Sequence, residues 1–236
     1  MPEQTAEPQL IVERYARRNV GDRYSMLRPE IWLGMQERQR VILNLFKQDL
    51  SWQSMSDKTL LEVGCGNGGN LLDFLRFGFL PEHLSGSELL EERIAAARHS
   101  LPTAITIHSG DSINAEIDDD SQDIVFQSVV FSSLLDDQFQ QAVANQMWQW
   151  VKPGGGILWY DFIFNNPSNP DVRGIPIKRV RNLFPDGKMI VKRITLAPPI
   201  SRRVCKIHPN FYHLFNMIPW LRTHVLIWIE KPKVIK

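Results

Sequence analysis

Residues 60–69, LLEVGCGNGG, pass from a short apolar run through an acid into a turn that contains four glycines. Glycine tolerates positive φ angles and lets backbone N–H groups approach a ligand, so this junction is typical of a strand that ends beside a nucleoside-type ligand. Gly64 and Gly66 belong to two overlapping patterns. With Gly69 they make GxGxxG, and with Gly68 they make GxGxG. The ligand class predicted for the turn depends on which pattern the chain uses.

Apolar strands and helical segments alternate on the C-terminal side of this turn. We expect strands at residues 59–64, 83–89, 104–111, 124–131, 156–164, 189–199 and 224–232. Helices are expected at residues 30–50, 69–79, 89–101, 136–151 and 209–221. This alternation predicts an α/β fold built on a doubly wound, mostly parallel sheet with helices on both faces.

The length of 236 residues, with 43% hydrophobic residues, fits one α/β core with additions. We divide the chain into an N-terminal arm and helix at 1–50, on the lid or substrate side, and a main domain at 51–236. Within the main domain, residues 166–206 are expected to form a basic substrate-side insertion or lobe. The sequence has no apolar run of about 18 residues and no leader-like start, so we expect a soluble, cytoplasmic protein.

Charge is distributed unevenly, although the formal net charge is only +1. Residues 173–206 hold ten Lys or Arg and one acid, Asp186, which leaves +9 in this segment and −8 in the remainder. Two interpretations stay open, namely solvated strands and loops, or a surface that meets an anionic group such as a phosphate or an acidic lipid surface. Cys65 and Cys205 give neither a disulfide framework nor a zinc spacing.

Acidic residues stand at the ends of three expected strands. Glu62 precedes Gly64 by two residues, Glu88 ends the second strand and Asp111 ends the third. Ligands bind at the carboxyl ends of strands in open α/β sheets, so the three acids are predicted to converge on one ligand. Glu62 would accept from an ammonium group, Glu88 from ribose hydroxyls and Asp111 from an adenine amino group. The structural alternatives are loop capping or an arginine partner for Glu62, and capping of the next turn for Asp111.

These segments, taken in order, resemble the class I S-adenosylmethionine-dependent methyltransferases. LLEVGCGNG is similar to their first motif, GSE at 86–88 to the second-strand acid, and GD at 110–111 to the adenine contact. VKPGGGILWYDF at 151–162 is similar to their turn into the fifth strand. The resemblance covers roughly residues 58–163. It implies a Rossmann-like, seven-stranded sheet with an antiparallel C-terminal strand, the GxGxG pattern, and S-adenosyl-L-methionine as the cofactor.

Positions that match the family imply which residues contact the methyl donor. They are Glu62, Gly64, Cys65, Gly66, Gly68, Glu88, Leu89, Asp111, Ser112, Gln127 and Ser128. The second-strand acid departs from the family pattern, because Glu replaces the commoner Asp and follows SGS where an apolar residue is usual. No pattern of ligands suggests a metal site.

The implied reaction depends mainly on how the methyl donor and the nucleophile are aligned. A sulfonium methyl group is already activated, so the enzyme mainly orients a nucleophile and excludes water. If the nucleophile is a hydroxyl, a base contributes further. The candidates for this base are His208, His213 and Asp161.

The acceptor is predicted from a missing motif and from charge. Residues 127–130 read QSVV rather than an NPPY-like tetrapeptide, so a nucleic-acid acceptor is not expected. Together with the basic segment, this favours O-methylation of a small or lipid-linked anionic acceptor, such as a saccharide or phenol-like hydroxyl. Residues 173–206 also allow peripheral membrane contact. The alternatives are an NAD-dependent oxidoreductase and a non-catalytic S-adenosylmethionine-binding protein, and the oligomeric state stays open.

The residues before the main domain have two interpretations. Residues 15–25, YARRNVGDRYS, form either a lid that closes over the donor or an unstructured arm. Tyr15, Arg18 and Tyr24 are the expected contacts of the lid.

Overall fold

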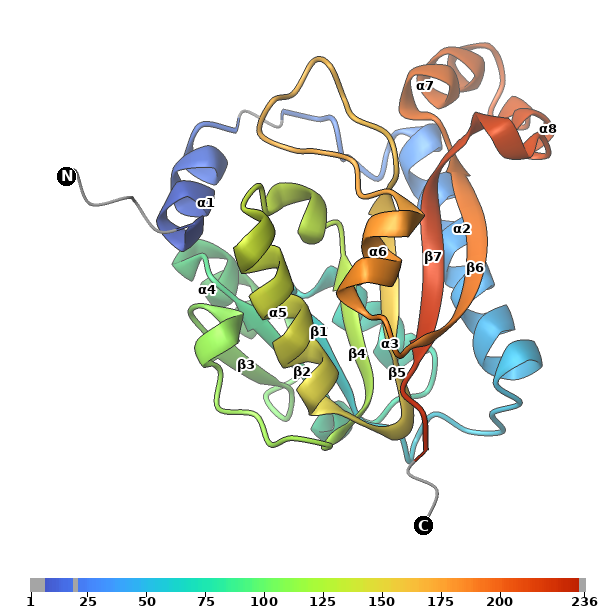
Figure 1. Cartoon of the computed structure of the whole chain (residues 1–236). Coiled ribbons are helices and arrows are strands. Elements are labelled where there is room, and N and C mark those ends of the chain that lie inside the picture. The colour runs from blue at the N-terminus through green and yellow to red at the C-terminus, as the bar shows by residue number, and fades with distance from the viewer. Residues whose placement is uncertain (1–6, 19–20, 234–236) are drawn as a thin grey trace.

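A seven-stranded sheet organises the chain, which a computed structural model describes at residues 7–18 and 21–233 (Figure 1). The strand order is β3-β2-β1-β4-β5-β7-β6. The strands are β1 (Leu60–Val63), β2 (Leu84–Glu88), β3 (Thr106–Ser109), β4 (Gln122–Ser128), β5 (Val151–Phe162), β6 (Lys188–Leu196) and β7 (Arg222–Glu230). Strand β7 pairs antiparallel with both β5 and β6, and the other neighbouring strands pair parallel. The predicted fold class is confirmed.

The strand order reverses direction between β1 and β4. From β1 the chain builds outward through β2 to β3, and it then returns to the other side of β1 to build β4 and β5. Ligands of open α/β sheets bind beyond the carboxyl ends of the strands at such a reversal. The topology therefore places the expected site over the glycine turn that follows β1.

Helices cover both faces of the sheet. One face packs against α2 (Pro29–Asn44), α3 (Gly69–Arg76) and α4 (Glu91–Ser100), and the other against α1 (Glu7–Ala16), α5 (Asp137–Trp150) and α6 (Ile177–Leu183). Neighbouring residues of β1 serve opposite faces, because Leu60 joins the first core cluster and Leu61 the second. Double coverage explains why all four residues of β1 are buried, including the acid.

Four helical elements differ from the expectations. Helices α1, α6 and α7 (Pro198–Ile207) were not predicted, and α8 (Phe211–Asn216) is shorter than the segment expected at 209–221. The sixth strand ends at Leu196 rather than 199, because Pro198 fits the first turn of a helix and has no N–H for a strand ladder. After α8, Pro219 begins a 3₁₀ turn. Helix α6 has seven residues, too few for its apolar periodicity to stand out.

The basic residues 166–206 do not form a separate lobe. They supply α6, the edge strand β6 and most of α7, which lie in different parts of the fold (Figure 1). Arg173 and Arg179 pair with Asp137, and Lys192 pairs with Asp49 at 2.6 Å. The +9 of this segment is therefore divided among separate surfaces and partly neutralised by acids from elsewhere in the chain.

Candidate active site

Three glycines of the turn between β1 and α3 have positive φ angles, which are 65° at Gly64, 57° at Gly66 and 82° at Gly68. An added Cβ would lie 2.6 Å from a Val130 methyl carbon at Gly64, and 2.7 Å from a leucine methyl carbon at Gly68. Gly69 has no positive φ, and no atom lies within 4 Å of such a Cβ. The backbone therefore requires the GxGxG pattern, and the GxGxxG match through Gly69 is coincidental.

Glu62 is the penultimate residue of β1 and is a fully buried acid beside this turn. Asn70 Nδ2 donates to its Oε1 at 2.6 Å, whereas Oε2 is buried and has no hydrogen-bond partner among the described residues. Burial raises the pKa of Glu62 to about 8, and the Asn70 hydrogen bond opposes this rise only in part. A buried carboxyl oxygen without a partner is costly, so this atom is suited to receive a donor from a ligand.

Glu88 ends β2 and organises the neighbouring backbone. Its Oε2 accepts from Gly66 N at 2.8 Å, and its Oε1 accepts from Leu89 N and Leu90 N at 2.9 and 3.0 Å. The carboxylate thus ties the glycine turn to the start of α4. The predicted contact with ribose hydroxyls would use the lone pairs that these three bonds leave free.

Asp111 and Ser112 follow β3. Asp111 Oδ1 accepts from Ile113 N at 3.1 Å, which is the capping role considered as its structural alternative. Ser112 Oγ lies 2.9 Å from Ser87 Oγ, so the loop after β3 is fixed to β2 beside Glu88. The adenine contact stays a prediction, and capping holds the Asp111 carboxylate at the carboxyl edge where that contact would form.

The end of β4 completes this edge of the sheet. Gln127 is fully buried, and its amide accepts from Val130 N at 3.0 Å and donates to Tyr160 O at 3.3 Å. These bonds hold Val130 against Gly64, where the Cβ of any other residue would collide. Ser128 Oγ accepts from Arg38. The ends of β1, β2, β3 and β4 are thus joined by hydrogen bonds around the turn.

Comparisons with known proteins agree with this geometry. Residues 60–155 match the family described as a methyltransferase domain. The chain is 28% identical over 152 residues to phthiotriol/phenolphthiotriol dimycocerosates methyltransferase 1 of Mycobacterium ulcerans, which covers 61% of this chain and 53% of that protein. It is 26% identical over 129 residues to the tRNA N(3)-methylcytidine methyltransferase trm140 of Schizosaccharomyces pombe, covering 51% of this chain and 40% of that protein.

The fold comparison gives the same result. The crystal structure of an S-adenosylmethionine dependent methyltransferase from Mesorhizobium loti matches with a TM-score of 0.58 at 14% identity, covering 81% of this chain and 100% of that chain. Residues 60–155 therefore match a methyltransferase domain, and the chain has the fold of an S-adenosylmethionine dependent methyltransferase. It spans about half the length of the curated relatives that it matches.

Helix α2 contributes two polar residues, Glu37 and Arg38, that the sequence interpretation missed. Arg38 donates to Ser128 Oγ at 3.0 Å and to Asn70 Oδ1 at 2.5 Å, and Asn70 in turn donates to Glu62. The neighbouring Glu37 is buried, and it accepts from side chains of α8. Arg38 lies on the apolar stripe of α2, three residues after Met35 and four before Ile42. A positively charged residue on an otherwise apolar stripe is the sequence signal that could have identified Arg38.

Tyr160 and His224 lie next to Arg38. The Arg38 guanidinium carbon is 5.0 Å from the centroid of the Tyr160 ring, and the His224 ring stacks on Tyr160 with centroids 5.2 Å apart. Burial, together with the nearby Arg38, lowers the pKa of His224 to about 4. His224 is therefore neutral at pH 7. Tyr160 hydroxyl and Thr195 Oγ1 are 3.0 Å apart, which links β5 to β6.

The three candidate bases do not come together. Asp161 is fully buried on the face of α5 and α6, where it accepts from Ser132 N at 3.1 Å and from Phe162 N. Burial raises the pKa of Asp161 to about 7. His208 and His213 are exposed residues beside α7 and in α8. Among the described residues these three share no hydrogen-bond partner, so a role as base stays a prediction for each.

Cys65 and Leu89 pack beside the glycine turn. The Cys65 side chain is buried against β2, where a Cβ at Gly86 would lie 2.7 Å from its sulfur. Burial raises the pKa of the Cys65 thiol, which keeps it protonated and unreactive. Leu89 is partly buried against the core that α5 and α6 cover. Both residues are consistent with packing roles around the turn.

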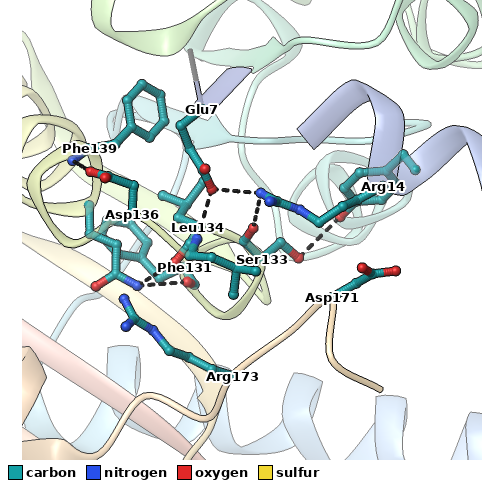
Figure 2. A network of polar contacts seen from close by, with 12 residues as sticks. Glu7, Arg14, Phe131, Ser133, Leu134, Asp136, Phe139, Asp171 and Arg173 are labelled. Carbon is teal, nitrogen blue, oxygen red and sulfur yellow. Dashed lines mark hydrogen bonds and ion pairs between the residues drawn. The ribbon is translucent and has the colours of Figure 1, made fainter. Parts of the chain in front are cut away.

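The N-terminal segment forms a docked helix where the sequence allowed a lid or an arm. Arg14 of α1 donates to Glu7 at 2.6 Å and to Ser133 O at 3.0 Å, and Glu7 accepts from Leu135 N (Figure 2). Figure 2 shows these groups meeting at the loop that follows β4. Helix α1 therefore closes against the end of β4, beside the turn. Two residues of the expected lid segment, 19 and 20, lie outside the described residues.

The ring of Tyr15 contacts two arginine side chains. The guanidinium carbons of Arg18 and of Arg93 in α4 lie 4.1 and 4.4 Å from the centroid of its ring. Arg18 Nε and Nη2 are buried and have no hydrogen-bond partner among the described residues. The expected contact Tyr24 is instead 67% exposed. Of the three expected lid contacts, Tyr15 and Arg18 thus lie together near the loop after β2.

Residues 7–18 and 21–233 contain no group of three or more His, Cys, Asp or Glu side chains arranged to hold a metal ion. None of their helices is both long and apolar enough to cross a membrane.

Proposed function

We propose that this chain transfers the methyl group of S-adenosyl-L-methionine to a hydroxyl oxygen of a small or lipid-linked, anionic acceptor. The observation that carries the donor part of the proposal is the buried Oε2 of Glu62, which lies beside a turn of three positive-φ glycines and has no hydrogen-bond partner in residues 7–18 and 21–233. An ammonium group is the hydrogen-bond donor that such an oxygen favours, because the charged pair compensates for burial.

The residues of the site would mainly bind and orient. Asn70, held by Arg38, fixes one oxygen of Glu62 and leaves the other free for the amino group of the donor. Glu88 is placed for the ribose and Asp111 for the adenine. The bound sulfonium compound supplies an activated methyl group. Alignment of an acceptor oxygen with that group accounts for about 7–11 kcal/mol of barrier lowering in well-oriented reactions.

The acceptor part of the proposal has weaker but independent support. Relatives of this chain are methyltransferases named for phthiotriol, a lipid alcohol. On the β5 side of the site, Arg38 provides a partly buried cation and His224 a neutral imidazole. A cation favours an anionic acceptor, and a neutral imidazole can accept a hydrogen bond from a hydroxyl. The tRNA methyltransferase relative makes tRNA the necessary comparison substrate.

Calorimetry separates the donor classes. S-adenosylhomocysteine is expected to bind the purified chain and NAD is not. Glu62→Gln is expected to weaken the binding of S-adenosylmethionine, which carries the same ammonium group. Binding of NAD in preference to S-adenosylhomocysteine would refute the methyl-transfer proposal and restore the oxidoreductase interpretation.

A radiolabelled methyl-transfer screen tests the acceptor. Extracts are divided into anionic metabolites, lipids and tRNA, and each fraction is incubated with wild type and with Glu62→Gln. Label is expected in a lipid or anionic metabolite fraction, and Kd for that acceptor is expected to rise with salt. Label in tRNA alone would contradict the acceptor assignment. Donor binding without label in any fraction would favour the non-catalytic alternative.

A further inference from the structure

Helices α7 and α8 project from the sheet beside the N-terminal end of α2 (Figure 1). They connect β6 to β7 and have an inner side that belongs to a small core. That core consists of Leu33, Leu196, Val204, Cys205 and Tyr212. Tyr212 hydroxyl and Asn216 Nδ2 also donate to Glu37 at 2.8 and 2.6 Å. The inner sides of both helices are therefore fixed to the body of the protein.

The outer sides of these helices are apolar as well. Ile207 is 75% exposed, Met217 74% and Trp220 83%, and Leu214 is more than half exposed. With 3.6 residues per turn, Leu214 lies nearly opposite the buried Tyr212, so α8 is apolar on two sides. Exposed apolar side chains gathered in this way mark an interaction surface on soluble proteins.

A second exposed segment adjoins the first. Tyr24, Met26 and Leu27 directly precede α2, and Trp32 of α2 packs against the core that holds α7. The most exposed large apolar side chains of residues 7–18 and 21–233 are Leu27, Trp220, Ile207, Met217 and Tyr24. All of them lie in these two segments, which meet at the end of α2 (Figure 1). We call residues 24–27 and 198–221 the apical surface.

The apical surface is also positively charged. Residues 198–221 contain Arg202, Arg203 and Lys206 and no acidic residue. None of these three cations forms an ion pair within the described residues, in contrast to Arg173, Arg179 and Lys192 of the same basic stretch. Residues 198–221 thus hold both cations and exposed Trp and aliphatic side chains, and this combination binds the interface of an anionic membrane.

We propose that the apical surface docks on an anionic lipid bilayer, with Trp220, Met217 and Leu214 in the headgroup layer and Arg202, Arg203 and Lys206 on lipid phosphates. A second copy of the chain fits this surface less well, because a two-fold contact would bring the same three cations together. The docking does not depend on the acceptor being a lipid. It specifies where the wider membrane contact expected for residues 173–206 would occur.

Vesicle co-sedimentation of the full chain tests the proposal. Binding is expected to phosphatidylcholine vesicles that contain about one-third phosphatidylglycerol, and to be much weaker with phosphatidylcholine alone. Replacing Arg202, Arg203 and Lys206 by Gln is expected to weaken partitioning about 100-fold at low salt, from about 1 kcal/mol for each charge. Trp220→Ser combined with Met217→Ser is expected to weaken it at least 10-fold, whereas Lys178→Gln, Arg181→Gln and Lys188→Gln together leave it within about 3-fold.

The outcomes separate this proposal from the function proposed above. S-adenosylhomocysteine binding is measured for every variant and is expected to stay at the wild-type level, which also shows that each variant folds. Equal binding to both vesicle types, equal loss in the Lys178, Arg181 and Lys188 control, or absence of vesicle binding by wild type would each overturn the docking proposal. A concentration-dependent dimer that Trp220→Ser abolishes would overturn it in favour of self-association.

Discussion

The glycine turn with its surrounding acids, where we propose that the methyl donor binds, and the apical surface are suited to opposite kinds of partner. On the donor side, Glu62, Glu88 and Gln127 are buried polar groups held by specific hydrogen bonds, most of them to backbone N–H groups. On the apical surface, Trp220 and Leu27 are exposed and apolar, and the same surface includes cations that form no ion pair among the described residues. The first arrangement suits one small ligand of fixed shape, and the second suits a soft, extended surface. One chain would thus use one region for methyl transfer and another for attachment to a membrane.

Adjacent residues of α2 connect these two regions. Glu37 accepts from Tyr212 and Asn216 of α8, and Arg38 donates to Asn70, which donates to Glu62. A rigid helix that holds both ends of this path is a physical route between them. The predictions that follow test whether the regions act independently, from the largest expected effect to the smallest.

Gly64→Ala is expected to have the largest effect. The added Cβ would meet Val130 at 2.6 Å, and φ of 65° disfavours alanine, so the free energy of unfolding should fall by about 2–4 kcal/mol. Donor affinity should fall at least 100-fold in calorimetry. Gly69→Ala is the matched control, and it should keep wild-type affinity because nothing opposes its Cβ. Equal damage from both substitutions would argue against the GxGxG assignment.

Glu62→Gln is expected to lower the affinity for S-adenosylmethionine about 10- to 100-fold, because a hydrogen bond between charged groups contributes about 1.5–3 kcal/mol. Calorimetry measures this loss. Vesicle binding through the apical surface should not change. If Glu62→Gln binds the donor as tightly as wild type, the ammonium contact is wrong.

The pH dependence of Glu62 gives a separate result. Its pKa is raised to about 8, so the ligand-free protein loses stability as pH rises from about 4.5 to 8, because the unfolded chain gives up this proton while the buried carboxyl keeps it. Glu62→Gln should therefore increase the Tm of the ligand-free protein most at pH 8 to 9. Below pH 8, donor binding should release a proton, detectable as a buffer-dependent enthalpy. A Tm difference that does not change with pH would contradict the buried, neutral acid.

Arg38→Met is expected to lower donor affinity about 3- to 10-fold, because Asn70 would lose the bond that orients it toward Glu62. In a double-mutant cycle, the effects of Arg38→Met and Glu62→Gln should be clearly less than additive. Arg40→Met, an exposed position of the same helix, is the control and should have no effect. Full additivity would show that Arg38 does not act through Glu62.

Arg14→Ala should release α1 and cost about 1–3 kcal/mol locally, because Arg14 and its partner Glu7 are both less than one-tenth exposed. Limited proteolysis of the N-terminal segment measures the release. Arg17→Ala removes an ion pair in which Arg17 is 63% exposed, so it should change the cleavage rate little. Equal cleavage of both variants would show that the Arg14 contacts do not hold the helix.

The sequence alone was enough to predict the glycine turn after β1 and the acids near it. A strand that ends in glycines, with acids closing three strands, is a local pattern in which each residue is set by its own backbone position, so Gly64, Gly68 and Glu62 could be chosen without coordinates. The alternation of strands and helices likewise gave the doubly wound sheet, because burial on each face follows a short period.

Only the tertiary structure decided the partners of these residues. Arg38 meets Asn70 and Ser128 across 32 and 90 positions of sequence, and Glu37 meets Tyr212 across 175, so no local pattern reports either contact. The ten cations of residues 173–206 looked like one basic surface, but folding paired some with distant acids and left Arg202, Arg203 and Lys206 without an ion pair among the described residues. Local backbone conformation can be read along the chain, whereas the environment of a side chain depends on which distant segments pack against it.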